Sequence, residues 1–95
     1  DRVLSIEFTG EPSIPTGGFG KLFTAKIDGE VYDGAEWTIT GDCTPTGVCF
    51  KGGNTTTTGA KCKITCMDDS KLIGQVVVLT VKAAGLTEKI ELEVI

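Results

Sequence analysis

The chain of 95 residues contains no histidine and few aromatic side chains: one tryptophan, one tyrosine and four phenylalanines. Without histidine, neither a Ser-His-Asp nor a Cys-His catalytic arrangement can form. Basic residues never stand side by side, so the sequence offers no basic face for nucleic acid. Apolar runs stay far below the ~20 residues of a membrane helix. These absences predict a protein that is not an enzyme, with no nucleic-acid partner and no membrane insertion.

What the chain does contain is glycine (13 residues), many threonines and a net charge of −4. This composition favours β-strands joined by tight turns over helices. The length suits one domain with one core. The sequence has no signal peptide and no starting methionine. We therefore expect residues 1–95 to form a single domain of a longer protein.

Alternating apolar residues predict about seven strands, because side chains on a strand point to opposite faces in turn. Spacings of roughly 10–12 residues between short strands, with glycine-rich turns, are typical of an antiparallel β-sandwich of two sheets. Trp37 has the parity of the core residues Ala35 and Ile39, so we expect it to be buried. The predicted strands are 3–8, 21–27, 35–40, 48–51, 60–66, 73–82 and 87–95.

Two features of this pattern leave alternatives open. In segment 48–51, either Val48 and Phe50 or Cys49 faces the core. The threonine run 55–58 lies in a polar stretch that is expected either as a loop or as the extension of a hairpin between segments 48–51 and 60–66.

Four cysteines allow two disulfides, and they also allow four reduced thiols. Cys62 and Cys66 stand in one strand with their Cα atoms roughly 13 Å apart, which is beyond disulfide reach. The preferred disulfides are the nested pairs Cys43–Cys66 and Cys49–Cys62, since the loops around 43 and 66 should share one end of the sandwich. The local pair Cys43–Cys49 is the rival, and the reduced state is as well supported as all these schemes together.

Other groups of residues in the sequence do not predict a metal-binding site. A Cys62/Cys66 pair is too spread for tetrahedral zinc. Four loop acids fall at one end, but they lack the pattern of a calcium loop and are expected to be solvated: Glu11, Asp42, Asp68 and Asp69. We expect neither a cofactor nor a metal. Tyr32 and Phe19 lie in loops, where an aromatic side chain can contact a partner such as carbohydrate.

Three segments carry a family resemblance: VLSI at 3–6, LFTAKI at 22–27 and AEWTI at 35–39. They resemble the opening of bacterial Ig-like domains of group 2, the intimin/invasin-like type. The stretch CKITCMDDSKLIGQ at 62–75 is similar to Ig-like modules of tailed-bacteriophage structural proteins. The chain departs from the family pattern in loop 43–49 and in the threonine run.

The resemblance implies an immunoglobulin-like sandwich displayed on a virion or in an extracellular, cell-surface setting. The expected function is that of a non-enzymatic module on a phage tail or capsid exterior, for display or weak attachment to bacterial cell-surface glycans. Its partners would be other domains or subunits of that assembly and cell-surface carbohydrate. Two alternatives stay open, a stalk or adhesion module of a bacterial surface protein and an accessory binding domain of a cell-wall or polysaccharide enzyme, because a fold does not fix a function.

Overall fold

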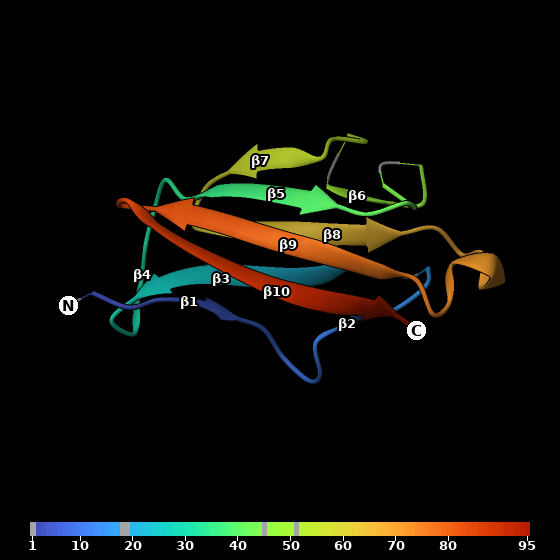
Figure 1. Ribbon diagram of the computed structural model, residues 1–95, viewed down its shortest axis with the longest axis horizontal. Coiled ribbons are helices and arrows are strands. Elements are labelled where there is room, and N and C mark those ends of the chain that lie inside the picture. The colour runs from blue at the N-terminus through green and yellow to red at the C-terminus, as the bar shows by residue number, and fades with distance from the viewer. Residues whose placement is uncertain (1, 18–19, 45, 51) are drawn as a thin grey trace.

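Alternating apolar residues build two facing β-sheets, as the ribbon in Figure 1 shows. The computed structural model describes residues 2–17, 20–44, 46–50 and 52–95. The strands of the first sheet are, in spatial order, β1 (Leu4–Glu7), β3 (Lys21–Ile27), β8 (Lys61–Cys66) and β6 (Val48–Phe50), with β4 (Glu30–Val31) paired to β3. Those of the second are β2 (Ser13–Ile14), β10 (Leu86–Val94), β9 (Val76–Ala83), β5 (Glu36–Thr40) and β7 (Thr56–Thr58).

The predicted β-sandwich is confirmed, but the described residues form ten strands where about seven were expected. The three additional strands, β2, β4 and β7, are two or three residues long. Strands this short carry too few alternating positions to be seen as a period of two. A second difference is the 3-10 turn η1 (Ser70–Leu72), after which β9 begins at Val76, later than the expected start at residue 73. Lys51, placed in the expected strand 48–51, lies outside the described residues.

The order of the strands is that of an immunoglobulin-like sandwich. In the letters used for such domains, β1, β3, β8 and β6 are A, B, E and D, and β10, β9 and β5 are G, F and C. The first strand is divided between the sheets. Its first part, β1, pairs antiparallel with β3, and its second part, β2, pairs parallel with β10. Pro12 and Pro15 flank β2, as expected at a sheet edge.

The threonine run forms an edge strand and not the hairpin considered from the sequence. Thr56–Thr58 make up β7, which pairs with β5, so that Thr57 lies opposite Trp37. The neighbouring β6 pairs with β8 in the other sheet, so segments 48–51 and 60–66 are paired as considered from the sequence, without the threonine run extending them. The chain therefore crosses from β6 in the first sheet to β7 in the second and returns to β8.

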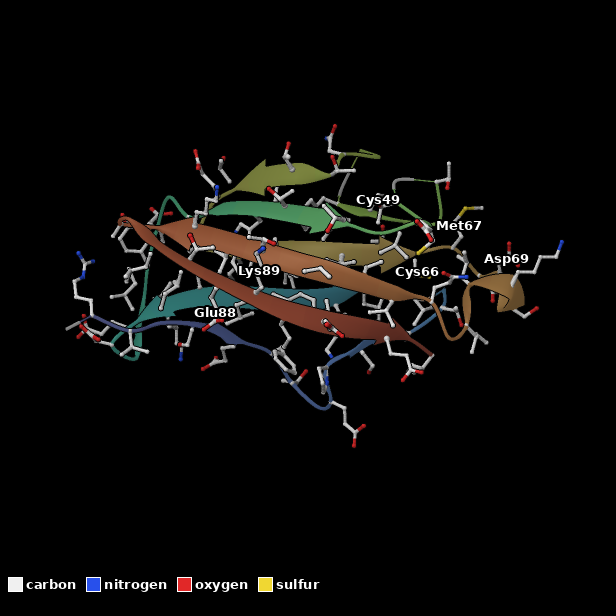
Figure 2. The ribbon with its side chains drawn as sticks, viewed as in Figure 1. Cys49, Cys66, Met67, Asp69, Glu88 and Lys89 are labelled. Atoms are coloured by element: carbon white, nitrogen blue, oxygen red, sulfur yellow. The ribbon has the colours of Figure 1, made fainter. Side chains whose placement is uncertain are left out.

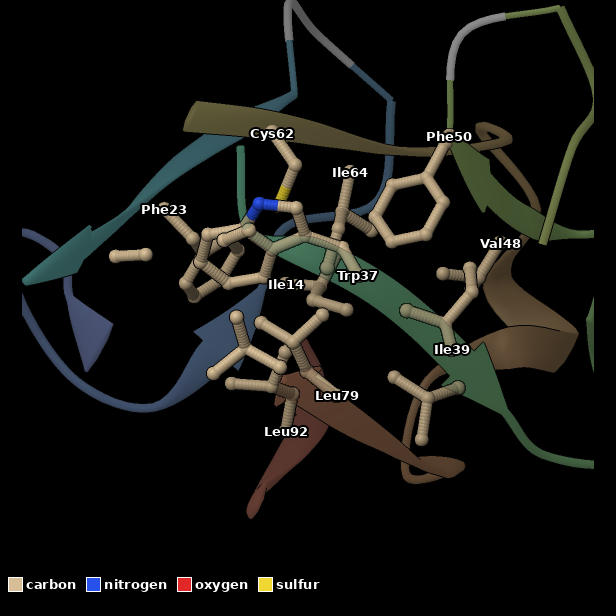
Figure 3. Packing of buried hydrophobic residues seen from close by; sticks show 14 of the residues in the cluster. Ile14, Phe23, Trp37, Ile39, Val48, Phe50, Cys62, Ile64, Leu79 and Leu92 are labelled. Atoms are coloured by element: carbon tan, nitrogen blue, oxygen red, sulfur yellow. The ribbon is translucent and has the colours of Figure 1, made fainter. Parts of the chain in front are cut away.

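The core lies between the sheets and consists of apolar and thiol side chains (Figure 3). Trp37 is fully buried, as predicted, and its Nε1–H donates to the carbonyl of Gly59 at 2.9 Å. Val48 and Phe50 face the core and Cys49 is half-buried, which settles the parity of this strand. Within the described residues no polar or charged side chain is buried.

Three loops meet at one end of the sandwich, as the strand order predicted. The Gly17 N–H donates to the carbonyl of Cys66 at 3.0 Å, and the Met67 N–H donates to the carbonyl of Gly47 at 2.9 Å. These bonds join the loops that follow β2, β5 and β8. In the described part of the chain, no helix has the length and apolar character needed to cross a bilayer.

Candidate functional site: a lysine-lined groove on the first sheet

An open groove of about 450 Å³ runs over the outer face of the first sheet, across β1, β3 and β8. In the strand register, Leu22 lies opposite Lys63, and Thr24 lies opposite both Lys61 and Glu7. Outward-facing positions of three strands therefore form its floor. The lining residues are Glu7, Phe8, Thr9, Gly20, Lys21, Leu22, Thr24, Lys61 and Lys63.

The apolar part of the groove is provided by Phe8 and Leu22. The Phe8 ring packs against the core ring of Phe23, with centroids 5.6 Å apart and planes tilted by 50°. This contact holds Phe8 in place from below while part of its surface stays accessible. Leu22 is 57% exposed although it is apolar. Together they give a small apolar surface beside polar groups, the composition that most binding grooves share.

The cationic part comes from three lysines. Lys21 Nζ lies 5.2 Å from the centre of the Phe8 ring, within the range of a cation–π interaction, and donates a hydrogen bond to the carbonyl of Glu11. Desolvation lowers the pKa of Lys21, and the charge of Glu11 opposes this shift. Lys61 and Lys63 are exposed and have no acidic partner among the described residues. Two ammonium groups therefore stand free at the groove.

Among the described residues, the one carboxylate that lines the groove is already engaged in an ion pair. Glu7 forms an ion pair with Lys26, which also lies on β3. Four of the nine basic residues of this acidic chain thus belong to β3 and β8: Lys21, Lys26, Lys61 and Lys63. The local charge of the groove is opposite to the net charge of the domain. Such a groove attracts anions, and its lysine side chains offer donors without fixed direction.

Gly20, just before β3, also lines the groove. Its φ of +85° is in the left-handed region, and a Cβ atom there would stand 2.7 Å from the carbonyl oxygen of Ile64. Only glycine accepts both conditions without a shift of the backbone. The absence of a side chain at Gly20 therefore allows the start of β3 to lie close to the backbone of β8.

The four cysteines, the residues singled out from the sequence, are free thiols at three places in the fold. Cys62 is buried in the core and lies opposite Phe23. Burial raises its pKa to about 12. Cys49 lies opposite Thr65, and its Sγ is 3.8 Å from Thr65 Oγ1. Cys49 and Cys62 therefore occupy opposite faces of the same sheet, and the nested pair Cys49–Cys62 does not fit this arrangement.

Cys43 and Cys66 are both buried at the end of the sandwich where the loops meet. Figure 2 shows Cys66 at the end of β8, followed by Met67 and Asp69. Burial raises the pKa of the Cys66 thiol, the nearby Cys43 raises it further, and the Gly17 N–H works against this shift. The expected proximity of residues 43 and 66 is thus found, with both thiols free.

The other residues noted from the sequence are the aromatic residues Tyr32 and Phe19 and the loop acids. Tyr32 is half-buried and packs against the core, and Phe19 lies outside the described residues. Asp69 caps η1 by accepting a hydrogen bond from the Lys71 N–H at 3.0 Å. Over residues 2–17, 20–44, 46–50 and 52–95, no three histidine, cysteine or acidic side chains are grouped to hold a metal ion.

Sequence reasoning missed the groove because its residues come from three strands that are distant in sequence. A partial signal was present in Lys61 and Lys63, which flank the inward-facing Cys62 and so had to point outward together. Their position beside Leu22 and Phe8 depends on the pairing of β3 with β8, which the alternation does not specify.

The chain was compared with protein-family models, curated proteins and solved structures, and none of the three comparisons gave a match.

Proposed function

We propose that the domain is a non-enzymatic, immunoglobulin-like attachment module on the exterior of a phage virion, such as its tail or capsid, and that it binds anionic glycans of the bacterial surface. The observation that carries the proposal is the groove in which Lys21, Lys61 and Lys63 surround Phe8 and Leu22. The family setting rests on the resemblance described above.

The composition of the groove supports a charged polysaccharide as its ligand. Phe8 and Leu22 offer apolar surface for the C–H face of a sugar ring, and the free ammonium groups of Lys61 and Lys63 offer partners for its carboxylate or phosphate groups. The groove is open, and Lys61 and Lys63 are exposed to solvent. Each exposed ion pair therefore contributes at most about 1 kcal/mol.

Single-site binding is consequently weak, and attachment depends on many copies. When several modules of one assembly engage one polymer, each further contact is intramolecular, and avidity can exceed the single-site affinity by about 10²–10⁴-fold. This fits a module that is displayed repeatedly on a particle.

The proposal is tested by titrating the domain with three polysaccharides: polygalacturonate, which carries carboxylates, teichoic acid, which carries phosphates, and neutral dextran. We expect saturable binding to one or both anionic polymers and none to dextran, and no cleavage of any of them. Equal binding to dextran, or none to either anionic polymer, would refute the ligand class.

A matched pair of double variants tests the site. Lys61→Gln with Lys63→Gln removes two charges from the groove, and Lys82→Gln with Lys89→Gln removes two exposed charges from the second sheet. Both double variants have the same net charge. Binding should fall about tenfold in the first and stay within twofold in the second, given about 0.7 kcal/mol per lost pair. Equal losses in both would show that binding depends on overall charge and not on the groove.

A further inference from the structure

At the end of the sandwich where three loops meet, backbone hydrogen bonds connect the segments that carry Cys43 and Cys66. The carbonyl of Cys43 accepts hydrogen bonds from the N–H groups of Gly47 (2.7 Å) and Val48 (3.0 Å). Val48 in turn lies opposite Cys66 in the pairing of β6 with β8. The Met67 N–H, next in the chain after Cys66, donates to Gly47. The loop that carries Cys43 is thus hydrogen-bonded onto the end of β8.

The other two cysteines, Cys49 and Cys62, lie elsewhere on the first sheet. Cys62 is four residues away from Cys66 on β8, roughly 13 Å along the strand. Cys49 is the neighbour of Val48 and so faces the opposite side of its sheet, against Thr65. Cys43 and Cys66 both belong to the buried core, and Cys66 Sγ contacts the carbonyl of Met67 at 3.5 Å. Of the four cysteines, Cys43 and Cys66 are the two that are buried at the end of the sandwich where the loops meet.

We infer that Cys43 and Cys66 form an oxidation site, at which a low-molecular-weight disulfide such as oxidised glutathione converts the two thiols into one intramolecular disulfide. One cysteine loses its proton, and its thiolate attacks a sulfur of the small disulfide, which releases one small thiolate. The second cysteine loses its proton and displaces the remaining half. Two small thiols leave with the two protons, so one disulfide is reduced as another forms.

The disulfide closes residues 43–66 into a loop that includes β6, β7 and β8. Because a closed loop restricts the unfolded chain, the oxidised domain should melt on the order of 10 °C higher than the reduced domain. Both ends of the bond lie in regions already joined by backbone hydrogen bonds, so oxidation should leave the two sheets unchanged.

The test incubates the intact domain with oxidised glutathione, blocks the remaining thiols with iodoacetamide in denaturant, and maps the bonds by mass spectrometry of a non-reduced digest. The expected result is a bond between Cys43 and Cys66, two alkylated thiols at Cys49 and Cys62, and a higher melting temperature. Four alkylated cysteines, a bond that involves Cys49 or Cys62, or a bond between two molecules would overturn the inference.

Variants provide the controls. Cys49→Ala should still form the bond and gain the same melting increment, whereas Cys66→Ala should show no increment under the same oxidant. The bond map of the wild-type domain decides the matter independently if Cys66→Ala is too unstable to purify. An equal increment in Cys66→Ala would also contradict the inference, because it would trace the stabilisation to another cause.

Discussion

At the scale of single residues, Gly20 and Gly29 illustrate two different reasons why a position requires glycine. Their φ angles are nearly equal, +85° and +84°. Around Gly29 a Cβ would meet no atom within 4 Å, whereas at Gly20 it would stand 2.7 Å from the Ile64 carbonyl oxygen. Gly29 follows Asp28, whose φ is +53°, and the two residues form the tight turn between β3 and β4.

Substitution by alanine should therefore have unequal effects at these two positions. Gly29→Ala should lower the free energy of unfolding by about 1–2 kcal/mol, the cost of a left-handed alanine. Gly20→Ala should lose about 1–3 kcal/mol more, because the added methyl group overlaps the backbone of β8. Urea unfolding followed by tryptophan fluorescence measures both. Equal losses would show that β3 and β8 separate freely at this point.

The buried thiol of Cys62 makes stability depend on alkaline pH. Its pKa in the folded state is about 12, raised by burial, while an unfolded cysteine titrates near 8.5. Below the pKa of the unfolded state the thiol is protonated in both the folded and the unfolded protein, so its titration does not change the free energy of unfolding in that range. Above the pKa of the unfolded state, the thiol ionises in the unfolded protein while it stays protonated in the folded protein. The free energy of unfolding then falls by up to about 1.4 kcal/mol per pH unit.

We therefore expect the free energy of unfolding to fall as the pH rises from about 9 to about 12. Cys66, whose pKa is also raised, contributes in the same direction. Cys62→Ala should reduce the slope of stability against pH over this range, as measured by urea unfolding at successive pH values with a reductant present. A variant with the wild-type slope would contradict the assignment to Cys62.

At the scale of elements, β2 shows how a strand of two residues is attached to a sheet although it is too short to show an alternation of apolar residues. Ser13 and Ile14 lie parallel to Glu93 and Val94 of β10, and Ile14 is fully buried. The Ile95 N–H donates to the carbonyl of Ile14 at 2.9 Å. One buried side chain and a few backbone bonds therefore attach the segment between two prolines to the second sheet.

Ile14→Ala should destabilise the domain by about 2–5 kcal/mol, because it leaves a cavity between the sheets. Ile73→Ala is the matched control, since Ile73 is 54% exposed, and it should change stability by about 0.5 kcal/mol or less. Hydrogen exchange gives a local reading: in Ile14→Ala the amide of Ile95 should exchange faster relative to that of Ile39 on β5. Unchanged exchange at Ile95 would show that β2 stays paired without its side chain.

At the scale of the whole molecule, charge is distributed unevenly between the sheets. The domain carries a net charge of −4, yet the groove on the first sheet is lined by three lysines. On the second sheet, Glu91 and Glu93 of β10 lie opposite Val78 and Val76 of β9. An anionic polymer should thus be attracted to the first sheet and repelled by the remainder of the surface.

Binding of polygalacturonate or teichoic acid should accordingly weaken as salt is added. Between about 0.1 M and 1 M salt the screening length falls from about 10 Å to about 3 Å, so most of the attraction of the exposed lysines should be lost. The dissociation constant, measured by titration calorimetry at several salt concentrations, should rise steadily for the wild type and less steeply for Lys61→Gln with Lys63→Gln. Salt-independent binding would mean that the lysines do not carry the interaction.

The sequence by itself determined the β-sandwich and most of its core, because alternation is a local property. Trp37, Ala35 and Ile39 all face inward as their parity predicted. The tertiary structure alone decided which strands are neighbours, and with that the partner of the threonine run, the groove and the positions of the thiols. Pairing depends on contacts between strands far apart in the chain, such as Lys63 with Leu22 and Cys66 with Val48, and a pattern with a period of two is the same whichever strand lies beside it.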